Sequence, residues 1–196
     1  MTGDGPIVGI LLAGGSGSRF GGNKLAATLN NGESIGHCAA RKLVDACGQV
    51  VVVIRGGDAP TRVLFEDLPV TLVECADASL GMAHTLNCGL NSASQAGGWL
   101  IALADMPFVL ESTLSALVSA GRAAQKITVP YSEQRRGNPV FFPAQFRAKI
   151  QRLTGDEGAR KLIAENPQNV TRIEVEDPGI HRDIDTRSDL ESSLQP

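Results

Sequence analysis

Residues able to handle anions are concentrated in the loop LLAGGSGSRFGGNKL, Leu11 to Leu25, where an apolar run gives way to five glycines. Arg19 and Lys24 are the two charged residues of this loop. Glycines let backbone N–H groups approach an anion closely, and nearby cations add opposite charge. The loop therefore predicts a binding site for a phosphate chain.

Neither common phosphate loop matches this spacing. The dinucleotide fingerprint GxGxxG would need a third glycine where Phe20 stands. Gly17 and Gly22 have the separation of a P-loop, but Asn23 stands where its lysine belongs and Lys24 where its Ser or Thr would bind magnesium. A glycine-rich turn without a ligand is the alternative, and it leaves the two cations unexplained.

A carboxylate follows a strand-like run in the middle of the chain. Asp105 comes directly after Trp99 to Ala104. At the carboxyl end of a parallel strand it would face the crevice where open α/β sheets bind ligands, and it is a hard oxygen ligand suited to Mg²⁺. The alternative is a helix or turn cap before Pro107.

The elements that must position these residues are indicated by short apolar runs alternating with amphipathic stretches, typical of βαβ units around a buried parallel sheet. The predicted strands are Ile7–Ala13, Val50–Ile54, Val70–Val73, Trp99–Ala104, Ile127–Pro130, Val140–Phe142 and Val170–Val175. The predicted helices are Ser34–Cys47, Ala59–Glu66, Met82–Ala93, Leu110–Ala124, Phe146–Leu153, Glu157–Glu165 and Thr186–Leu194. Thr186 and Asp189 have the spacing of a capping box. We expect one three-layer α/β domain over residues 1–196.

Composition narrows the function classes. A chain of 196 residues, 42% hydrophobic, can bury a core without disulfides or structural metal. The four cysteines form no CxxC pair, so we expect small buried hydrophobes, and neither they nor the three histidines have metal-ligand spacing. A net charge of -3 argues against a nucleic-acid partner. The absence of a long apolar run and of a signal-peptide pattern predicts no membrane partner and a cytoplasmic location.

The segment from Leu12 to Lys24 resembles the LAGGxGxRxGxxK signature of the sugar-nucleotide and molybdenum-cofactor nucleotidyltransferases, in which the loop wraps the triphosphate of an NTP. The resemblance implies a Rossmann-like nucleotidyltransferase fold with a mostly parallel central sheet. It implies that Arg19 contacts the leaving phosphates and that Lys24 steadies charge at the α-phosphate. The nucleotide-binding positions it implies in this loop are Leu12, Ala13, Gly14, Gly15, Gly17 and Ser18.

Two acidic motifs are similar to those of the same family. Leu103-Ala-Asp-Met-Pro107 resembles its LADMP motif, and Asp183-Ile-Asp-Thr-Arg-Ser-Asp-Leu190 resembles the DIDTPEDL ending of the molybdenum cofactor cytidylyltransferases, with Arg187 in place of proline. The resemblance implies Mg²⁺ between Asp105 and Asp185, with Asp183 as the alternative second ligand. Without it, the last acidic cluster would be a helix start with favourable charge.

Further motifs side with the cytidylyltransferase branch. Gly137-Asn-Pro-Val-Phe-Phe142 corresponds to a GHPV-type segment with Asn138 in place of histidine, and Gly155-Asp-Glu-Gly-Ala-Arg160 to GDxGAR. Gly81 to Leu90 resembles a stretch that borders the base, which implies base contacts from Ser79 and Gly81; an ordinary helix cap is the other role open to Ser79.

The resemblance spans Ile7 to Leu190 and implies transfer of NMP from an NTP, with CTP favoured, to molybdopterin or its molybdenum-loaded form, releasing pyrophosphate. Residues 1–107 would bind the NTP and 108–196 the acceptor. Candidate cations for the pterin phosphate are Arg135, Arg136, Arg160 and Lys161, although solvated surface residues are the ordinary alternative. Because Gly14 and Gly15 resemble the guanylyltransferase branch, GTP is the nearest rival. A sugar or alditol phosphate acceptor, or a non-catalytic NTP- or cofactor-binding chaperone for a molybdoenzyme client, are the others.

Overall fold

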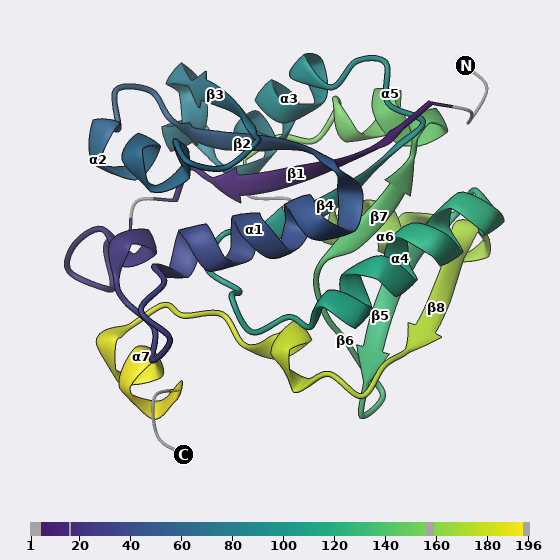
Figure 1. Ribbon diagram of the computed structural model, residues 1–196. Coiled ribbons are helices and arrows are strands. Elements are labelled where there is room, and N and C mark those ends of the chain that lie inside the picture. Colours follow the sequence, from purple (N-terminus) through teal and green to yellow (C-terminus); the bar gives the residue numbers. More distant parts are fainter. Residues whose placement is uncertain (1–4, 16, 156–158, 194–196) are drawn as a thin grey trace.

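The computed structural model describes residues 5–15, 17–155 and 159–193, and within them one sheet of eight strands runs through the molecule (Figure 1). The strands lie in the order β3-β2-β1-β4-β7-β5-β6, with β8 paired to β5. Pairs among β1 to β4 are parallel, whereas β7 runs antiparallel between β4 and β5. The strands are β1 Ile7–Ala13, β2 Gln49–Arg55, β3 Thr71–Cys75, β4 Gly98–Leu103, β5 Ile127–Ser132, β6 Arg135–Arg136, β7 Val140–Pro143 and β8 Val170–Glu174.

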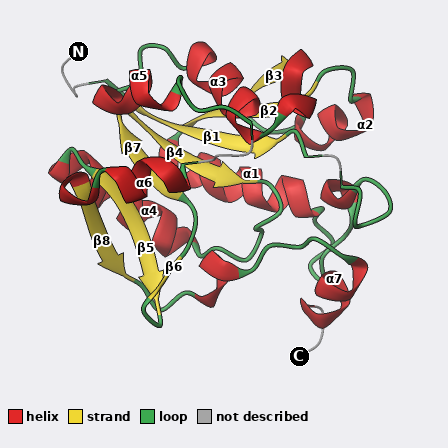
Figure 2. Ribbon diagram, turned by 180° about the vertical axis from the view of Figure 1, so that it is seen from behind, coloured by secondary structure: helices red, strands yellow, loops and turns green. Residues whose placement is uncertain are grey.

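Helices cover both faces of this sheet (Figures 1 and 2). The core side chains of α1 and α4 belong to one apolar cluster, and those of α3, α5 and α6 belong to a second cluster across the sheet. The predicted three-layer α/β class with a mostly parallel sheet is confirmed. The helices are α1 Ile35–Cys47, α2 Ala59–Arg62, α3 Met82–Ser92, α4 Glu111–Ala124, α5 Arg147–Ile150, α6 Arg160–Glu165 and α7 Arg187–Ser193.

The central strands are apolar on both sides because each side packs against helices. In β1, Ile7 and Leu11 join the cluster on the α1 side, while Val8 and Ile10 join the cluster on the α3 side. Successive side chains of a strand point to opposite faces, so a strand buried on both faces reads as a continuous apolar run. This double burial is why the runs in the sequence located β1, β2 and β4 correctly.

Some helices are shorter than the amphipathic pattern predicted. The predicted helix Ala59–Glu66 is α2 followed by a 3₁₀ turn at Val63–Phe65, and the predicted Phe146–Leu153 is a 3₁₀ turn at Ala144–Phe146 followed by α5. Apolar spacing cannot separate an α-helical turn from a 3₁₀ turn of the same length. The start of the predicted Glu157–Glu165 helix lies outside the described residues, and α6 begins at Arg160.

The expectation for the cysteines was wrong for one pair. Cys75 at the end of β3 and Cys88 on α3 form a disulfide, whereas Cys38 and Cys47 are free. The spacing of 13 residues contains no local signal, because the pairing arises when α3 packs back onto the strand that precedes it. The two free thiols fit the expected role of small apolar groups, and burial raises the pKa of Cys47 to about 12.

The order of the strands in the sheet determines where the ligand-binding crevice lies. The chain moves outward from β1 to β2 and β3, then returns across β1 to form β4 on its other side. Loops leaving the carboxyl ends of β1 and β4 therefore diverge at a topological switch point, where open α/β sheets bind ligands. Leu12 and Leu103 are paired there, so the glycine-rich loop and Asp105 leave the sheet side by side.

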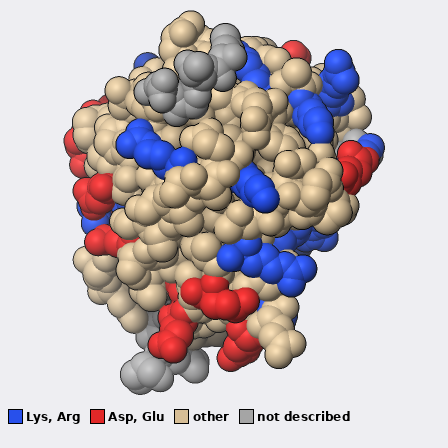
Figure 3. Space-filling model, turned by 90° about the vertical axis from the view of Figure 1, so that its right-hand side faces the viewer, with Lys and Arg blue, Asp and Glu red and all other residues tan. Residues whose placement is uncertain are grey.

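On the face shown in Figure 3, Lys and Arg side chains lie in several separate groups, whereas Asp and Glu side chains gather near its lower edge. Within the described residues, no helix has the length and apolar character needed to cross a membrane.

Close packing of α4 on β7 leads to a stability prediction. A Cβ added at Gly121 would overlap the fully buried ring of Phe141. Alanine would gain about 1 kcal/mol in helix propensity, but overpacking a rigid core costs roughly 1–3 kcal/mol. We expect Gly121→Ala to lower the free energy of unfolding in urea by about 1 kcal/mol, the middle of the range left by these two effects. Ser119→Ala, on the exposed side of the same helix, should be neutral or slightly stabilising, and equal behaviour of the two variants would contradict this packing.

Candidate active site

One lysine joins the two carboxylates expected to act together. The Nζ atom of Lys24 lies 2.7 Å from Oδ2 of Asp105 and 2.9 Å from Oδ1 of Asp185. These residues are separated by 81 and 161 positions along the chain and come from the glycine-rich loop, the end of β4 and the segment before α7. Asp105 caps no described helix, since α4 begins after Leu110. The structure thus brings Lys24, Asp105 and Asp185 into one cluster.

The position of this cluster keeps Lys24 charged. Only 12% of its side chain is exposed, and burial by itself would lower its pKa. The charge of Asp105 and hydrogen bonds to both carboxylates outweigh this effect, so the pKa of Lys24 is raised above its ordinary value of 10.5. Because the raised pKa belongs to a cation, the stability linked to the proton of Lys24 is fully present below pH 10.5 and is lost as the pH rises through the raised pKa.

Arg19 extends the cluster toward solvent. Its guanidinium lies 2.8 Å from Oδ2 of Asp185, and 74% of its side chain is exposed. A cation with this much exposure can leave its carboxylate at little cost, because surface ion pairs are weak. Arg19 is therefore placed to exchange Asp185 for an incoming anion.

The glycine-rich loop folds back on itself to deliver Lys24. Gly17 has a φ of 58°, and its carbonyl accepts a hydrogen bond from the amide of Phe20. Phe20 is buried in the core. The side-chain amide of Asn23 donates a hydrogen bond to the hydroxyl of Thr61 in α2, the helix that follows β2. Among the described residues no α-helix follows this loop directly, since α1 begins only at Ile35. Backbone amides and side-chain cations, without an adjoining helix N-terminus, are what this loop offers an anion.

A cavity of about 520 Å³, called here the nucleotide cavity, opens beside this loop. It is lined by all but two of the predicted nucleotide-binding and catalytic residues; Gly17 and Ser18 do not line it. Sequence reasoning missed Arg55 and Thr85. Arg55 is a cation at the carboxyl end of β2, a position whose proximity to the loop follows only from the strand order. The predicted residues in its wall are Leu12, Ala13, Gly14, Gly15, Arg19, Lys24, Ser79, Gly81 and Asp105.

The far wall of the nucleotide cavity is formed by the turn before α3. Ser79 lies in a 3₁₀ turn, and Gly81 is the N-cap of α3 with a φ of 120°, so the alternative of Ser79 as the helix cap is wrong. Opposite this turn, a Cβ on Gly14 would meet the Oγ1 atom of Thr85 at 3.0 Å. Gly14 and Thr85 therefore share tightly limited space at the edge of the cavity.

A second cavity of about 730 Å³, called here the acceptor cavity, adjoins the first, and the two share Leu12, Met82 and Leu103. Arg135 and Arg136 from β6 meet Arg160 and Lys161 from α6 in its wall. Burial and the neighbouring charge of Arg160 lower the pKa of Arg136. The four cations predicted from separate motifs thus line one cavity, and Arg135, Arg160 and Lys161 are also exposed to solvent.

The two alternative aspartates are separated by the same geometry. Asp183 lines the acceptor cavity, whereas Asp185 contacts Lys24 and Arg19. The predicted capping box is present, since Oγ1 of Thr186 accepts from the amide of Asp189 and the carboxylate of Asp189 accepts from the amide of Thr186. The hydroxyl and the amide of Thr186 both donate to the Asp189 carboxylate and lower its pKa, and the amide of Asp185 donates to the same carboxylate, which fixes the backbone at Asp185.

Asp105 has one carboxylate oxygen that could bind a divalent cation. Oδ1 of Asp105 is buried and receives no hydrogen bond from any described residue. Among the residues that the structure describes, no group of three or more His, Cys, Asp or Glu side chains could hold a metal ion. One or two carboxylates completed by phosphate oxygens and water are the usual ligands of Mg²⁺ in nucleotide enzymes. The residues present fit such an ion.

This sheet, with a glycine-rich loop and a carboxylate at its switch point, is the architecture of the Rossmann-like nucleotidyltransferases. The chain belongs to the family of MobA-like NTP transferase domains, whose model matches residues 9–170. The protein is therefore a nucleotidyltransferase, and the family resemblance of its motifs is confirmed.

Several known proteins are similar over nearly the whole chain. The chain is 30% identical over 189 residues to a nicotine blue oxidoreductase of Paenarthrobacter nicotinovorans, and 30% identical over 191 residues to the purine catabolism protein PucB of Bacillus subtilis, with 92% of each chain covered in both cases. A probable molybdenum cofactor guanylyltransferase of Mycobacterium tuberculosis is 25% identical over 197 residues, covering 97% of this chain and 94% of that protein. The crystal structure of Rv0371c from the same species has a TM-score of 0.86 at 24% identity, covering 98% of this chain and 99% of that one.

Removing the shared cation should expose repulsion between the carboxylates. In Lys24→Met, Asp105 and Asp185 would face each other without a counter-charge, and we expect a loss of roughly 1–3 kcal/mol in the free energy of unfolding at pH 7. Urea denaturation at pH 7 measures this loss. The exposed Lys126→Met is the matched control, and an equal loss in both variants would show that the carboxylates do not repel in this way.

Proposed function

We propose that the protein transfers CMP from CTP to molybdopterin, or to its molybdenum-loaded form, and releases pyrophosphate. The observation that carries this proposal is the position of Lys24. Its ammonium contacts Asp105 and Asp185 in the wall of the nucleotide cavity, and the acceptor cavity adjoins that cavity at Leu12, Met82 and Leu103. A nucleotide phosphate bound in the first cavity would lie beside this cation. The molybdenum cofactor guanylyltransferase among the relatives supports an acceptor of the same class.

In the proposed reaction an oxygen of the acceptor phosphate forms a bond to the α-phosphorus of the nucleotide, while the bond from that phosphorus to the bridging oxygen of pyrophosphate breaks. Both reactants are anions, so positioning and charge compensation carry the catalysis. Lys24 neutralises charge at the α-phosphate, and Arg19 follows the leaving phosphates after it releases Asp185. Glycine-loop amides at Gly14 and Gly15 hold the nucleotide.

Asp105 and Asp185 would hold Mg²⁺, with Oδ1 of Asp105 as the ligand atom most in need of a partner. When bound, the ion supplies Lewis-acid stabilisation and a template for the two phosphates. Lys24 would then turn from the carboxylates toward the nucleotide phosphates. A manganese complex is known for Rv0371c, whose fold is the same.

The walls of the acceptor cavity favour a flat ring that carries a phosphate. Arg135, Arg136 and Arg160 provide positive charge at one part of the cavity, and none of them forms a salt bridge with a described carboxylate. A pterin needs apolar surface for its ring and cations for its phosphate, whereas a sugar phosphate needs polar partners for many hydroxyls. The apolar part of the wall includes Leu12, Leu86, Ile101, Val140, Ile163 and Ile180.

Sequence motifs and the limited space at Gly14 favour CTP as the nucleotide. The segments at Gly137–Phe142 and at Asp183–Leu190 resemble the cytidylyltransferase branch. GTP is the second candidate, because Gly14 and Gly15 resemble the guanylyltransferase branch and the Mycobacterium tuberculosis relative carries that name. A larger purine would have to fit beside Thr85, which already approaches Gly14 closely.

The deciding experiment presents each of the four NTPs with molybdopterin or with a sugar phosphate in the presence of Mg²⁺, and follows pyrophosphate and product mass. We expect turnover with CTP and molybdopterin. In Asp105→Ala we expect turnover to fall by about two to three orders of magnitude, because removing one charge-stabilising group costs ~3–4 kcal/mol of barrier. The control is Asp45→Ala, an exposed aspartate of α1. Turnover with GTP alone would reassign the nucleotide, and normal turnover of Asp105→Ala would refute the metal role.

Arg136 tests the acceptor cavity separately. Replacing it with Gln should raise KM for molybdopterin roughly tenfold or more, because a hydrogen bond between charged groups contributes about 1.5–3 kcal/mol. KM for CTP should stay within about twofold of the parent value, since Arg136 lies outside the nucleotide cavity. Steady-state kinetics with each substrate varied in turn provide the measurement. Arg122→Gln, on the exposed side of α4, should change neither constant, and a rise in KM for CTP in Arg136→Gln would argue against the division of the two cavities.

A further inference from the structure

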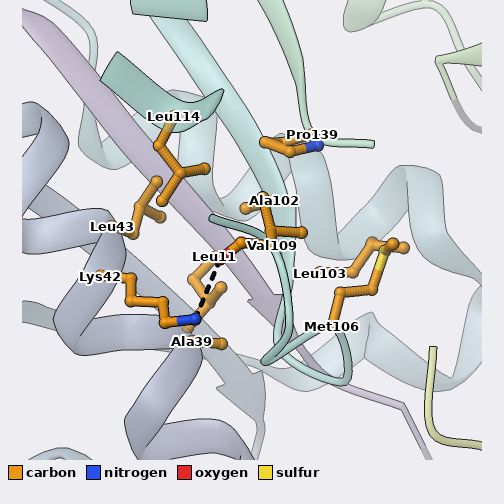
Figure 4. A pocket seen from close by; sticks show the side chains of 10 residues that line it. All are labelled: Leu11, Ala39, Lys42, Leu43, Ala102, Leu103, Met106, Val109, Leu114 and Pro139. Atoms are coloured by element: carbon orange, nitrogen blue, oxygen red, sulfur yellow. Dashed lines mark hydrogen bonds between the residues drawn. The ribbon is translucent and has the colours of Figure 1, made fainter. Parts of the chain in front are cut away.

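Lys42 is a cation in apolar surroundings. It lies on α1 and points into a small cavity of about 20 Å³ whose other lining side chains are all apolar (Figure 4). Within the described residues it forms no salt bridge. An ammonium placed among apolar side chains is unfavourable unless it makes hydrogen bonds. The lining residues are Leu11, Ala39, Lys42, Leu43, Ala102, Leu103, Met106, Val109, Leu114 and Pro139.

The partners of Lys42 are backbone carbonyls of the segment that follows Asp105. Its Nζ atom donates to the carbonyl of Pro107 at 2.7 Å and to that of Val109 at 3.0 Å. This segment connects β4 to α4 without regular secondary structure, so its carbonyls need donors from elsewhere in the fold. The Sγ atom of Cys38, one turn earlier on α1, also approaches the Pro107 carbonyl at 3.7 Å.

Asp105 is held between two such attachments. On one side its own carbonyl accepts from the amide of Ile184 at 2.9 Å, which links it to the segment carrying Asp185. On the other side the chain is fixed to α1 only two residues later, through Lys42 and Pro107. The direction of the Asp105 side chain depends on both attachments, because Met106 alone separates it from Pro107.

We propose that Lys42 is a positioning residue for Asp105. By donating to two carbonyls of the connection between β4 and α4, it sets the backbone that aims the Asp105 carboxylate at Lys24. Lys42 lines neither the nucleotide cavity nor the acceptor cavity, so it would act only through this segment. The catalytic consequence rests on the proposed function, whereas the effect on the backbone does not.

Two substitutions of Lys42 distinguish the loss of its hydrogen bonds from the loss of its packing. Lys42→Met keeps the length of the side chain and removes the donors, while Lys42→Arg keeps donors in the same place. Leu43→Val is the matched control, because it disturbs the wall of the same cavity and leaves the two hydrogen bonds of Lys42 in place. The amide of Met106 donates a hydrogen bond to the carbonyl of Leu103, and the amide of Leu110 donates to the carboxylate of Asp177. Hydrogen exchange of these two amides reports on the connection between β4 and α4 without requiring activity.

In Lys42→Met we expect exchange at these two amides to accelerate by at least about tenfold, and kcat to fall roughly tenfold to a hundredfold with KM for CTP nearly unchanged, since small displacements of a catalytic group have effects of this size. Lys42→Arg should recover most of both quantities. Leu43→Val should lower the melting temperature and leave exchange and kcat close to the parent values.

Two results would overturn the proposal: parent-like exchange in Lys42→Met, or equal losses of kcat in Lys42→Met and Leu43→Val. If the parent protein releases no pyrophosphate with any NTP and acceptor, the proposed function fails. The exchange rates in Lys42→Met then still decide whether Lys42 holds the segment.

Discussion

The site depends on one cation placed between two carboxylates that come from distant parts of the chain. Lys24 contacts Asp105 and Asp185 at 2.7 and 2.9 Å, and without it two negative charges would face each other in a partly buried crevice. A different structural feature positions each of these three residues. The glycine-rich loop turns back through Gly17 and buries Phe20, Asp105 leaves the sheet next to that loop, and the capping box at Thr186 fixes the backbone beside Asp185. The same attraction that stabilises the cluster keeps its groups within reach of a phosphate.

Much of this arrangement could be predicted from the sequence, because the relevant signals are local. Strands buried on both faces produce continuous apolar runs, so β1 was located at Ile7–Ala13 without error. A carboxylate directly after such a run must lie at the ligand-binding edge of a parallel sheet, so the sequence alone predicts the position of Asp105. The capping box of α7 is also local, since its two residues stand three positions apart.

The remainder depends on neighbours that are distant in sequence. Nothing around Cys75 or Cys88 indicates their pairing, which follows from the return of α3 onto β3. Arg55 borders the nucleotide cavity because β2 lies beside β1, and Lys42 reaches Pro107 because α1 packs against the connection to α4. In the other direction, Gly17 and Ser18 belong to the motif but do not line the cavity, since the turn at Gly17 directs the chain away from it. A motif identifies a loop, whereas its backbone conformation decides which members face the ligand.

The distribution of cations also explains why the molecule has two adjoining cavities. A nucleoside triphosphate and a phosphate-bearing acceptor repel each other. One strongly positive cavity would therefore bind either anion without bringing the two anions together. Arg19 and Lys24 are already paired with carboxylates and become available only as an anion or a divalent ion replaces those contacts. Arg136 is different: burial and Arg160 lower its pKa, and no described carboxylate forms a salt bridge with it, so an acceptor phosphate would relieve an existing electrostatic cost. The cations at the reaction centre are paired with carboxylates, whereas Arg136 forms no salt bridge with a described carboxylate, and in the proposed reaction this difference favours an acceptor phosphate bound beside the nucleotide.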